Sequence, residues 1–463
     1  MPTPSPPRAE PLYDVAVVGG GPAGVVVSRE LARMGHQVGM VMMPRGFPAF
    51  EGLAERAVQG LEHAGCVRAL SALGPRVQRS ASWNGEQFDG NREHIVDRER
   101  FDCALADDAR AAGVRVHVGR AARPLRHDDV WLLPWRDSDG SRRQLWARRL
   151  VEARGRRAPR YGLRLRRGPV TVAIGRMWRG IAGQSQTRIG TYENGWFWFA
   201  CHQGAAMLQF FQSLERAALP AGERLENRYQ AILERVGAAS VLVEGLEPVG
   251  RLQVRDAGTS CGDPAIDGCL SRVGEAVLTI DPLAGHGIFE AVGGALTLAV
   301  TINTQIRRPG RDRIAQCFYR DRVGADYQRM LVKGRQFYAL EQRWAEAPFW
   351  QERANGVEAP AAALDRLRVA ERPVAIDDLV ELREVLVSPE FPRGVWEVSG
   401  IPLVALLRLA LGDSGLAGVD GAAAALRRPV EDVGRALTWL QSRRLISPRG
   451  QLASELLTPD GAA

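Results

Sequence analysis

The N-terminal quarter of the chain alternates short apolar runs with a stretch of helical periodicity. Val15–Val18 is an apolar run of strand length, and it leads directly into a glycine-rich turn at residues 19–24. Residues 25–34 place apolar side chains at helical spacing, and Gln37–Met43 is again strand-like. This strand–helix–strand order predicts a βαβ unit at the start of an α/β fold.

Later segments extend this pattern. Helical spacing predicts helices at Glu51–Ala64 and Val96–Gly113, and a long apolar stretch predicts another at Phe289–Ile306. Between residues 165 and 270 the chain becomes strand-rich, for example at Gly195–Ala200. We therefore expect the middle section to form a separate sheet.

The C-terminal part has its own character. Residues 355–375 are rich in Ala, Pro, Glu and Arg, which indicates a connection. Beyond it, short helices are expected at Val419–Leu426 and Val430–Gln441, followed by a small hairpin formed by Leu445–Ser447 and Leu452. This order is similar to that of a winged helix.

These changes of pattern predict the domain organisation. A chain of 463 residues is too long for one simple core. We expect an α/β protein in which a Rossmann-type domain carries an inserted β-rich substrate domain and a small winged-helix-like C-terminal domain. The expected bounds are 1–12 for a disordered tail, 13–164 and 271–354 for the Rossmann-type domain, 165–270 for the inserted domain and 376–463 for the C-terminal domain.

Composition and charge add little to this picture. Apolar residues make up 45% and charged residues 25% of the chain, which are ordinary globular values. The net charge of +8 is carried almost entirely by arginine, and Lys333 is the single lysine. The six cysteines lack zinc-site spacing, and no signal peptide or membrane-spanning run is visible. We expect a cytoplasmic protein without a metal site.

The glycine-rich turn carries the clearest candidate chemistry. Gly19 permits the tight turn, Gly21 lets the backbone approach a pyrophosphate, and Gly24 lets the helix pack close to the strand. Pro22 and Ala23 begin the helix, whose free N–H groups and positive dipole end attract phosphate. The turn therefore predicts dinucleotide binding.

One expected element of such a site is missing. An acidic residue usually ends the second strand and binds the ribose hydroxyl groups, and Met42 occupies that position here. The ribose must then be held by water, by backbone groups or by Arg45.

Three later segments resemble the p-hydroxybenzoate-hydroxylase-like flavoproteins, whose cofactor is FAD. Residues 96–102, VDRERFD, resemble the family's helix start R-x-x-F-D, which implies that Arg98 reaches toward FAD. Residues 151–156, VEARGR, resemble the strand end D-A-x-G-R, with Glu152 in place of the aspartate. The resemblance spans about residues 13–310.

The third segment is the most informative. Gly274-Glu275-Ala276 and the following DPLAGHGI at 281–288 resemble the family's G-D-A and D-P-x-x-G-x-G-I run. The resemblance implies that Glu275 binds the ribityl chain of FAD. It also implies that the turn before the next helix faces the N1–C2=O edge of the flavin. The residues assigned to the cofactor in this way are Pro282, Gly285, His286, Gly287 and Ile288.

Flavoproteins of this type divide among hydroxylation, halogenation and C=C reduction. Residues 195–199, GWFWF, resemble the W-x-W-x-I-P signature of flavin-dependent halogenases, but the Ile-Pro is absent. Those halogenases also need a lysine in the flavin domain, whereas Lys333 follows the last flavin motif, so halogenation is disfavoured. Trp196 and Trp198 are either substrate contacts or alternate strand positions that pack the sheet.

Hydroxylation of an aromatic substrate through a flavin C4a-hydroperoxide is the leading expectation. The protein then has to exclude water, orient the substrate and supply a proton route. His286 is the first candidate acid or base, and Glu51 is the second. The alternatives are a flavin-dependent dehydrogenase or C=C reductase of a small or prenyl substrate, and a halogenase.

Residues 338–353 resemble a smaller group of these flavoproteins, which hydroxylates tryptophan in a precursor polypeptide during tryptophylquinone biogenesis, as in the maturation of quinohaemoprotein amine dehydrogenase. The resemblance implies a polypeptide substrate, which we expect the C-terminal domain to dock. Arg435, Arg443 and Arg444 would also allow nucleic-acid binding, which is less favoured than polypeptide docking, and a purely structural role of this domain is the third alternative. No second glycine fingerprint is visible, so electrons must come from transiently bound NAD(P)H or a separate flavin reductase.

Overall fold

The protein consists of two compact units. The computed structural model describes residues 11–160, 162–180, 183–213, 223–355, 367–388, 390–411, 418–443 and 445. The first unit comprises Met1–Arg307 and Tyr319–Ala359, and the second comprises Arg308–Phe318 and Pro360–Ala463. The predicted disordered tail lies outside the described residues as far as Glu10.

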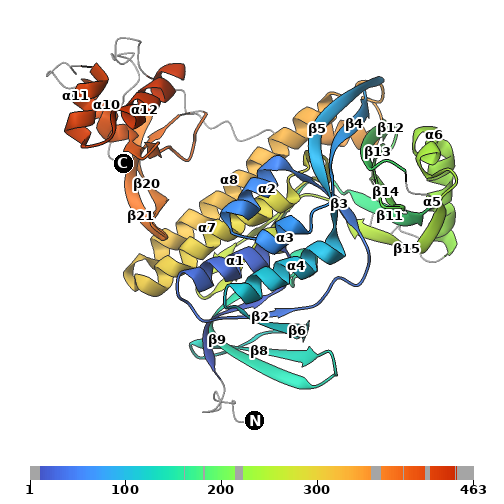
Figure 1. Ribbon diagram of the computed structural model, residues 1–463, viewed down its shortest axis with the longest axis horizontal. Coiled ribbons are helices and arrows are strands. Elements are labelled where there is room, and N and C mark those ends of the chain that lie inside the picture. The colour runs from blue at the N-terminus through green and yellow to red at the C-terminus, as the bar shows by residue number, and fades with distance from the viewer. Residues whose placement is uncertain are drawn as a thin grey trace. The chain divides into compact units, whose positions relative to one another are not determined.

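An eight-stranded sheet underlies the first unit, in the order β17-β18-β9-β1-β2-β6-β8-β7 (Figure 1). Its five central strands are parallel, and the predicted βαβ unit is confirmed by the pairing of Val15 in β1 with Val38 in β2. The strands are β1 Leu12–Val18, β2 Val38–Met42, β6 Arg115–Ala121, β7 Leu125–His127, β8 Val130–Asp137, β9 Arg142–Glu152, β17 Ile266–Asp267 and β18 Leu270–Arg272.

The apolar run in β1 is explained by burial on both faces of this sheet. Val15 and Val17 contact a core that includes three helices, whereas Ala16 and Val18 contact the layer formed by β8 and β9. A strand in this position has no polar face, so it reads as a continuous apolar run. The three helices are α1 Pro22–Arg33, α4 Arg98–Ala111 and α7 Gly287–Arg307.

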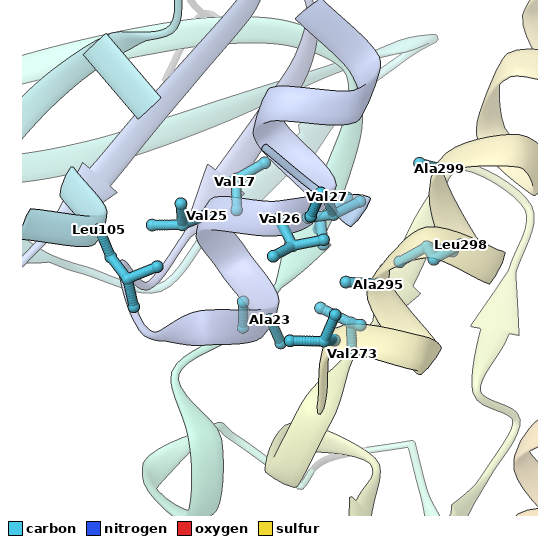
Figure 2. Close-up of a cluster of buried hydrophobic side chains, with 14 of the residues drawn as sticks. Val17, Ala23, Val25, Val26, Val27, Leu105, Val273, Ala295, Leu298 and Ala299 are labelled. Atoms are coloured by element: carbon cyan, nitrogen blue, oxygen red, sulfur yellow. The ribbon is translucent and has the colours of Figure 1, made fainter. Parts of the chain in front are cut away.

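Helix α7 packs directly on α1. Figure 2 shows Val26 of α1 facing Ala295 and Leu298 of α7, all within one buried cluster. By length and hydropathy alone α7 could cross a membrane, but 56% of its most apolar window is buried inside the fold. It is therefore the core helix of the first unit.

A second eight-stranded sheet follows the order β15-β11-β14-β13-β12-β4-β5-β3. It contains the strands expected from the middle section and also three strands from the N-terminal third of the chain. On β13, Trp196 and Trp198 lie on one face and Phe197 and Phe199 on the other. The strands are β3 Phe50–Ala54, β4 Arg76–Trp83, β5 Glu86–Asp97, β11 Val172–Arg179, β12 Gln186–Tyr192, β13 Gly195–His202, β14 Ala205–Gln212 and β15 Glu247–Asp256.

The helix predicted at Glu51–Ala64 begins later than expected. Residues Phe50–Ala54 form strand β3, and α2 covers only Glu55–His63. Glu51 pairs with Val96 of β5, so a strand partner from elsewhere in the chain overrides the local helical pattern. Glu51 is therefore a strand residue, which corrects its predicted place on a helix.

The remaining elements of the first unit are short, apart from α8, which belongs to this unit from Tyr319 onward. Figure 1 shows α5 and α6 beside the second sheet. These helices are α3 Val67–Ser71, α5 Glu223–Arg235, α6 Gly237–Ser240, α8 Asp312–Ala339 and α9 Pro348–Asn355. A small sheet consists of β10 Arg164–Arg167, β16 Ser260–Asp263 and β19 Leu278–Thr279. Single 3₁₀ turns of this unit lie at Gly155–Arg157, Val241–Val243, Gly274–Ala276 and Pro282–Ala284, and another, Pro309–Arg311, belongs to the second unit.

The second unit has its own apolar core, built around α10 Leu403–Leu411, α11 Gly418–Leu426 and α12 Val430–Ser442. The two predicted helices are confirmed as α11 and α12. Most of the predicted hairpin at 445–452 lies outside the described residues, so the winged helix stays a prediction. The unit also contains a hairpin that the sequence pattern did not predict, β20 Arg368–Ile376 with β21 Leu379–Val387, and a small pair, β22 Glu397–Val398 with β23 Ile401–Pro402.

Candidate active site

The glycine turn after β1 has the geometry that its spacing predicts. Gly19 has a φ of +116°, and a Cβ there would lie 2.4 Å from the carbonyl oxygen of Ala153. A Cβ on Gly24 would lie 1.9 Å from the carbonyl oxygen of Gly19, so the backbone of the helix packs directly against the backbone of the turn that follows the strand. A Cβ on Gly21, by contrast, would meet nothing within 4 Å. Open space therefore lies beside the start of α1.

The start of α1 is free to bind an anion. Gly21 is its N-cap and offers no side chain to the backbone N–H groups, and Pro22 occupies the first turn, which contains no acidic residue. Ala23 is buried against this turn. The unbonded N–H groups and the positive end of the helix dipole therefore face the open space, as a phosphate site requires.

Met42 fills the position where an acidic residue was expected. Its side chain packs on the turn, because a Cβ on Gly20 would lie 2.7 Å from both Cβ and Sδ of Met42. A buried thioether at this point contributes packing and no strong hydrogen bond to a ribose.

Arg98 is the centre of a partly buried group of charges. Its Nη1 lies 2.7 Å from Glu51 Oε2, and its Nη2 lies 2.8 Å from Asp102 Oδ1. Arg45 Nε bonds the other oxygen of Asp102 at 3.1 Å. Burial alone would raise the pKa of Glu51, but Arg98 and Arg45 hold it below its ordinary value. A paired, ionised Glu51 is better suited to holding Arg98 than to transferring a proton.

Three further guanidinium contacts surround Phe47, which precedes β3. The Cζ atoms of Arg45, Arg157 and Arg255 lie 5.1, 6.0 and 4.2 Å from the centre of the Phe47 ring. Burial, together with nearby Arg45 and Arg98, lowers the pKa of Arg255 to about 10 although Glu51 opposes this shift. Because neighbouring cations disfavour the charged form of Arg255, an anion bound beside it would be stabilised.

The turn at Gly274–Ala276 joins the two glycine-rich segments. A Cβ on Gly274 would lie 2.8 Å from Cβ of Ala23 in α1 and 3.8 Å from Cβ of Ala291 in α7. Glu275 follows, and its Oε1 accepts a hydrogen bond of 2.9 Å from Arg156 Nε. The turn therefore places Glu275 between the starts of α1 and α7.

The second glycine segment leads into α7. Pro282 begins a 3₁₀ turn, Gly285 ends it in the left-handed region with a φ of +63°, and Gly287 opens the helix. A Cβ on Gly287 would meet nothing within 4 Å, and Ile288 turns inward and is buried. This turn, like the first, leaves backbone exposed to open space at a helix start.

His286 lies at the centre of this turn. Its Nε2 is 2.5 Å from Nζ of Lys333 in α8, and its Nδ1 is buried without a partner in the part of the chain that the structure describes. Burial first, and then the positive charges of Lys333 and Arg56, lower the pKa of His286 to about 4. The imidazole is therefore neutral near pH 7.

Trp196 is held in place from both sides. Its ring stacks on Phe211 with centroids 3.8 Å apart, and its Nε1 donates to the hydroxyl of Tyr338 at 3.2 Å. Tyr338 in turn donates to Asp281 Oδ2 at 2.9 Å. Trp198 is buried on the same face of the sheet. This aromatic wall supports the loop that carries His286, and a direct contact of either tryptophan with substrate stays a prediction.

Lys333, Tyr338, Arg255 and Phe47 were not among the predicted site residues. Lys333 follows the flavin motifs in sequence, yet it contacts His286 because α8 packs beside the start of α7. As the single lysine of the chain, Lys333 could have been recognised as a candidate site residue from the sequence. Its position after the flavin motifs, however, argued against a place in the site. The objection to halogenation that rested on this position therefore loses its force.

The two glycine turns fit a flavin dinucleotide. The space beside Gly21 suits a pyrophosphate, and the charge of Arg255 interacts with that of Glu275. Glu275 lies between the two helix starts. The open backbone at Gly287 is a group that a polar ring edge would satisfy.

Comparisons with known proteins agree with this geometry and confirm the resemblance found in the motifs. Residues 12–316 match the family model for an FAD binding domain. The flavin-dependent halogenase otaD of Aspergillus niger is 25% identical over 369 residues, which are 69% of this chain and 72% of the relative. The flavin-dependent halogenase armH1 of Armillaria mellea is 24% identical over 377 residues, 69% of this chain and 70% of the relative.

Solved structures extend the match over nearly the whole chain. The peptidyl tryptophan dihydroxylase QhpG, essential for tryptophylquinone cofactor biogenesis, has a TM-score of 0.79 and 32% identity, covering 94% of this chain and 100% of that chain. The flavin-dependent halogenase CmlS has a TM-score of 0.73, covering 96% of each chain. At 17% identity, CmlS is a likeness of fold alone.

Proposed function

The chain belongs to the FAD-binding domain family of flavin monooxygenases, with FAD as its cofactor, and we propose that it hydroxylates a tryptophan side chain in a precursor polypeptide during tryptophylquinone biogenesis. The observation that carries the proposal is the 32% identity to the peptidyl tryptophan dihydroxylase over 94% of this chain. The structure contributes a site whose two helix starts fit FAD.

Bound and reduced, FAD supplies the activation of dioxygen for transfer of an oxygen atom. The chain's own residues hold and surround it. In this proposal the N–H groups at Gly21–Gly24 bind the pyrophosphate, Arg45 and Arg98 balance its charge, and Glu275 binds the ribityl chain. Backbone N–H groups at Gly285–Ile288 stabilise negative charge on the ring.

The aromatic wall has a separate task in this proposal. Trp196, Phe211 and Tyr338 form a buried, packed cluster beside the loop of His286. Excluding water from this side protects the oxygen-transfer step from side reactions.

The proposal is tested with the purified, FAD-loaded protein, a reductant and a peptide that contains one tryptophan. NAD(P)H is supplied alone and, in a parallel reaction, with a separate flavin reductase, because either source of electrons is compatible with the chain. We expect a product that is heavier by one or two oxygen atoms and that takes its label from ¹⁸O₂. A peptide with phenylalanine in place of the tryptophan is the control, and equal oxidation of both peptides would contradict the proposal.

Halogenation is a second candidate because of one observation. The amine of Lys333 lies 2.5 Å from His286 at the start of α7, so the chain does place a lysine beside the flavin motif. Adding chloride or bromide to the same reaction distinguishes the two functions. Incorporation of a halogen, abolished by Lys333→Met, would replace the proposed hydroxylation.

The second unit is proposed to dock the polypeptide substrate. Arg435 is engaged by Asp432, and the guanidinium of Arg443 lies over the ring of Trp439 at 4.4 Å. Arginines held in this way are less available to phosphate groups, so the contacts favour a polypeptide over nucleic acid. A DNA gel shift at low salt is the direct check, and strong retardation would contradict the docking proposal.

A further inference from the structure

Lys333 and His286 form part of a ladder between two helices. On α7, Glu290 lies one turn after His286, and on α8, Arg329 lies one turn before Lys333. Arg329 Nη2 is 2.8 Å from Glu290 Oε1, and Lys333 Nζ is 2.5 Å from His286 Nε2. The ion pair thus joins α8 to α7 at a point one helical turn from the lysine–histidine contact. It thereby fixes how Lys333 approaches His286.

The chemistry of the two side chains determines where the ring proton lies. An ammonium group has three donors and no acceptor, so Nε2 of His286 must accept from Lys333. In a neutral imidazole the other nitrogen then carries the proton. That nitrogen, Nδ1, is buried and has no partner among the residues that the structure describes.

The surroundings keep the imidazole neutral. Lys333 and Arg329 of α8 and Arg56 of α2 all act to lower the pKa of His286, as does Arg79 of β4. Glu290 is the nearest carboxylate on α7, and its charge is balanced by Arg329. The ring of Phe289 adds an apolar neighbour at 6.1 Å between centroids.

We propose that Lys333 is a positioning residue that fixes the Nδ1–H tautomer of His286, so that a neutral imidazole with its protonated nitrogen turned into the protein holds the turn that opens α7. The place of this turn beside the flavin rests on the proposed function, whereas the tautomer does not. The backbone N–H groups of the turn would then serve the cofactor edge, and the charge of Lys333 would act through the histidine without touching the flavin.

The tautomer can be read directly by NMR of protein with ¹⁵N-labelled histidine rings. His286→Gln identifies the resonances of His286 among the seven histidines. We expect a protonated Nδ1 and an unprotonated Nε2 in the wild-type protein near pH 7. Lys333→Met should move the proton to Nε2, and Lys333→Arg, which keeps a donor, should restore Nδ1–H. A wild-type ring protonated on Nε2, or no change in Lys333→Met, would overturn the inference.

A matched variant separates the hydrogen bond from the charge. Arg56 is exposed on α2 and lowers the pKa of His286 through its charge, without a hydrogen bond to the ring. Arg56→Met should therefore raise the pKa of His286 and leave its tautomer unchanged. If Arg56→Met moved the proton as Lys333→Met does, general electrostatics and not the contact with Lys333 would set the tautomer.

The link to the flavin has its own readout. Addition of FAD to the apo-protein should shift the ring resonances of His286, and unchanged resonances would overturn the place of this turn beside the flavin. Because Lys333 is the single lysine, ¹³C-methylation of amines yields one side-chain signal, whose labelling FAD should slow. Neither measurement uses a peptide, so failure of the peptide assay would remove the proposed substrate and not this inference.

Discussion

The hydroxyl of Tyr338, on α8, donates a hydrogen bond of 2.9 Å to Asp281 Oδ2, on the loop that precedes α7. The same hydroxyl accepts from Trp196 Nε1 at 3.2 Å. One buried oxygen therefore connects the second sheet, the last long helix and the loop of the second glycine turn. The position of that loop depends on contacts made far from it in sequence.

Tyr338→Phe should destabilise the first unit by about 1–3 kcal/mol, because it leaves a buried carboxylate and an indole N–H without this partner. Denaturant unfolding monitored by tryptophan fluorescence measures the change. Tyr192→Phe is the matched control, since its buried hydroxyl has no partner among the described residues and its loss should be neutral or stabilising. Equal losses in both variants would show that the Tyr338 hydroxyl carries no special role.

Gly21→Ala should leave the fold intact and weaken FAD binding by at least about tenfold, because the new Cβ meets nothing in the protein but enters the space beside the helix start. Fluorescence titration with FAD and thermal unfolding of the apo-protein measure the two effects. Gly24→Ala is the contrast, since its Cβ would lie 1.9 Å from the Gly19 oxygen and should destabilise the apo-protein. Tight FAD binding by Gly21→Ala would place the pyrophosphate elsewhere.

The stability of the apo-protein should fall as the pH drops from about 6.5 to about 4. The pKa of His286 is lowered from 6.5 to about 4 in the fold, so the unfolded chain takes up this proton first. For a half-buried ring the effect is on the order of 1 kcal/mol after solvent screening. His286→Gln should flatten this part of the pH profile. An unaltered profile in His286→Gln would refute the assignment.

Glu51→Gln should destabilise the first unit by about 1–3 kcal/mol, because buried Arg98 loses one of its two anionic partners. Urea unfolding of the variant gives the difference. Glu55→Gln breaks the exposed pair with Arg76 and should change stability by less than about 1 kcal/mol. If Glu51 acted chiefly in proton transfer, its replacement would instead reduce turnover and leave stability unchanged.

Local pattern was enough to predict the parts of the fold that depend on neighbours in sequence. The apolar run of β1, the glycine spacing and the helix start at Arg98 each contain their own signal, and each is found where expected. The family match over residues 12–316 confirms the flavoprotein assignment that rested on them.

Long-range pairing explains what the pattern missed. Glu51 reads as helical from its neighbours, but β5 offers it a strand partner in Val96. The contact of Lys333 with His286 depends on how α8 packs beside α7, and no spacing within either segment reveals it. Met42 was recognised from the sequence as a replacement for the expected acidic residue. Its packing against Gly20 could not be predicted from the sequence.

The joining of β4 to β12 has a consequence for synthesis. Arg79 pairs in parallel with Thr187, so the strands from the N-terminal third leave the ribosome well before the edge that receives them. Until then the edge of β4 is unpaired, and an unpaired strand edge is exposed to aggregation or to capture by a chaperone. A nascent chain that ends before β12 should therefore be sensitive to protease throughout β4 and β5. Splitting the gene between β5 and β12 would place strands that pair with each other on separate polypeptides.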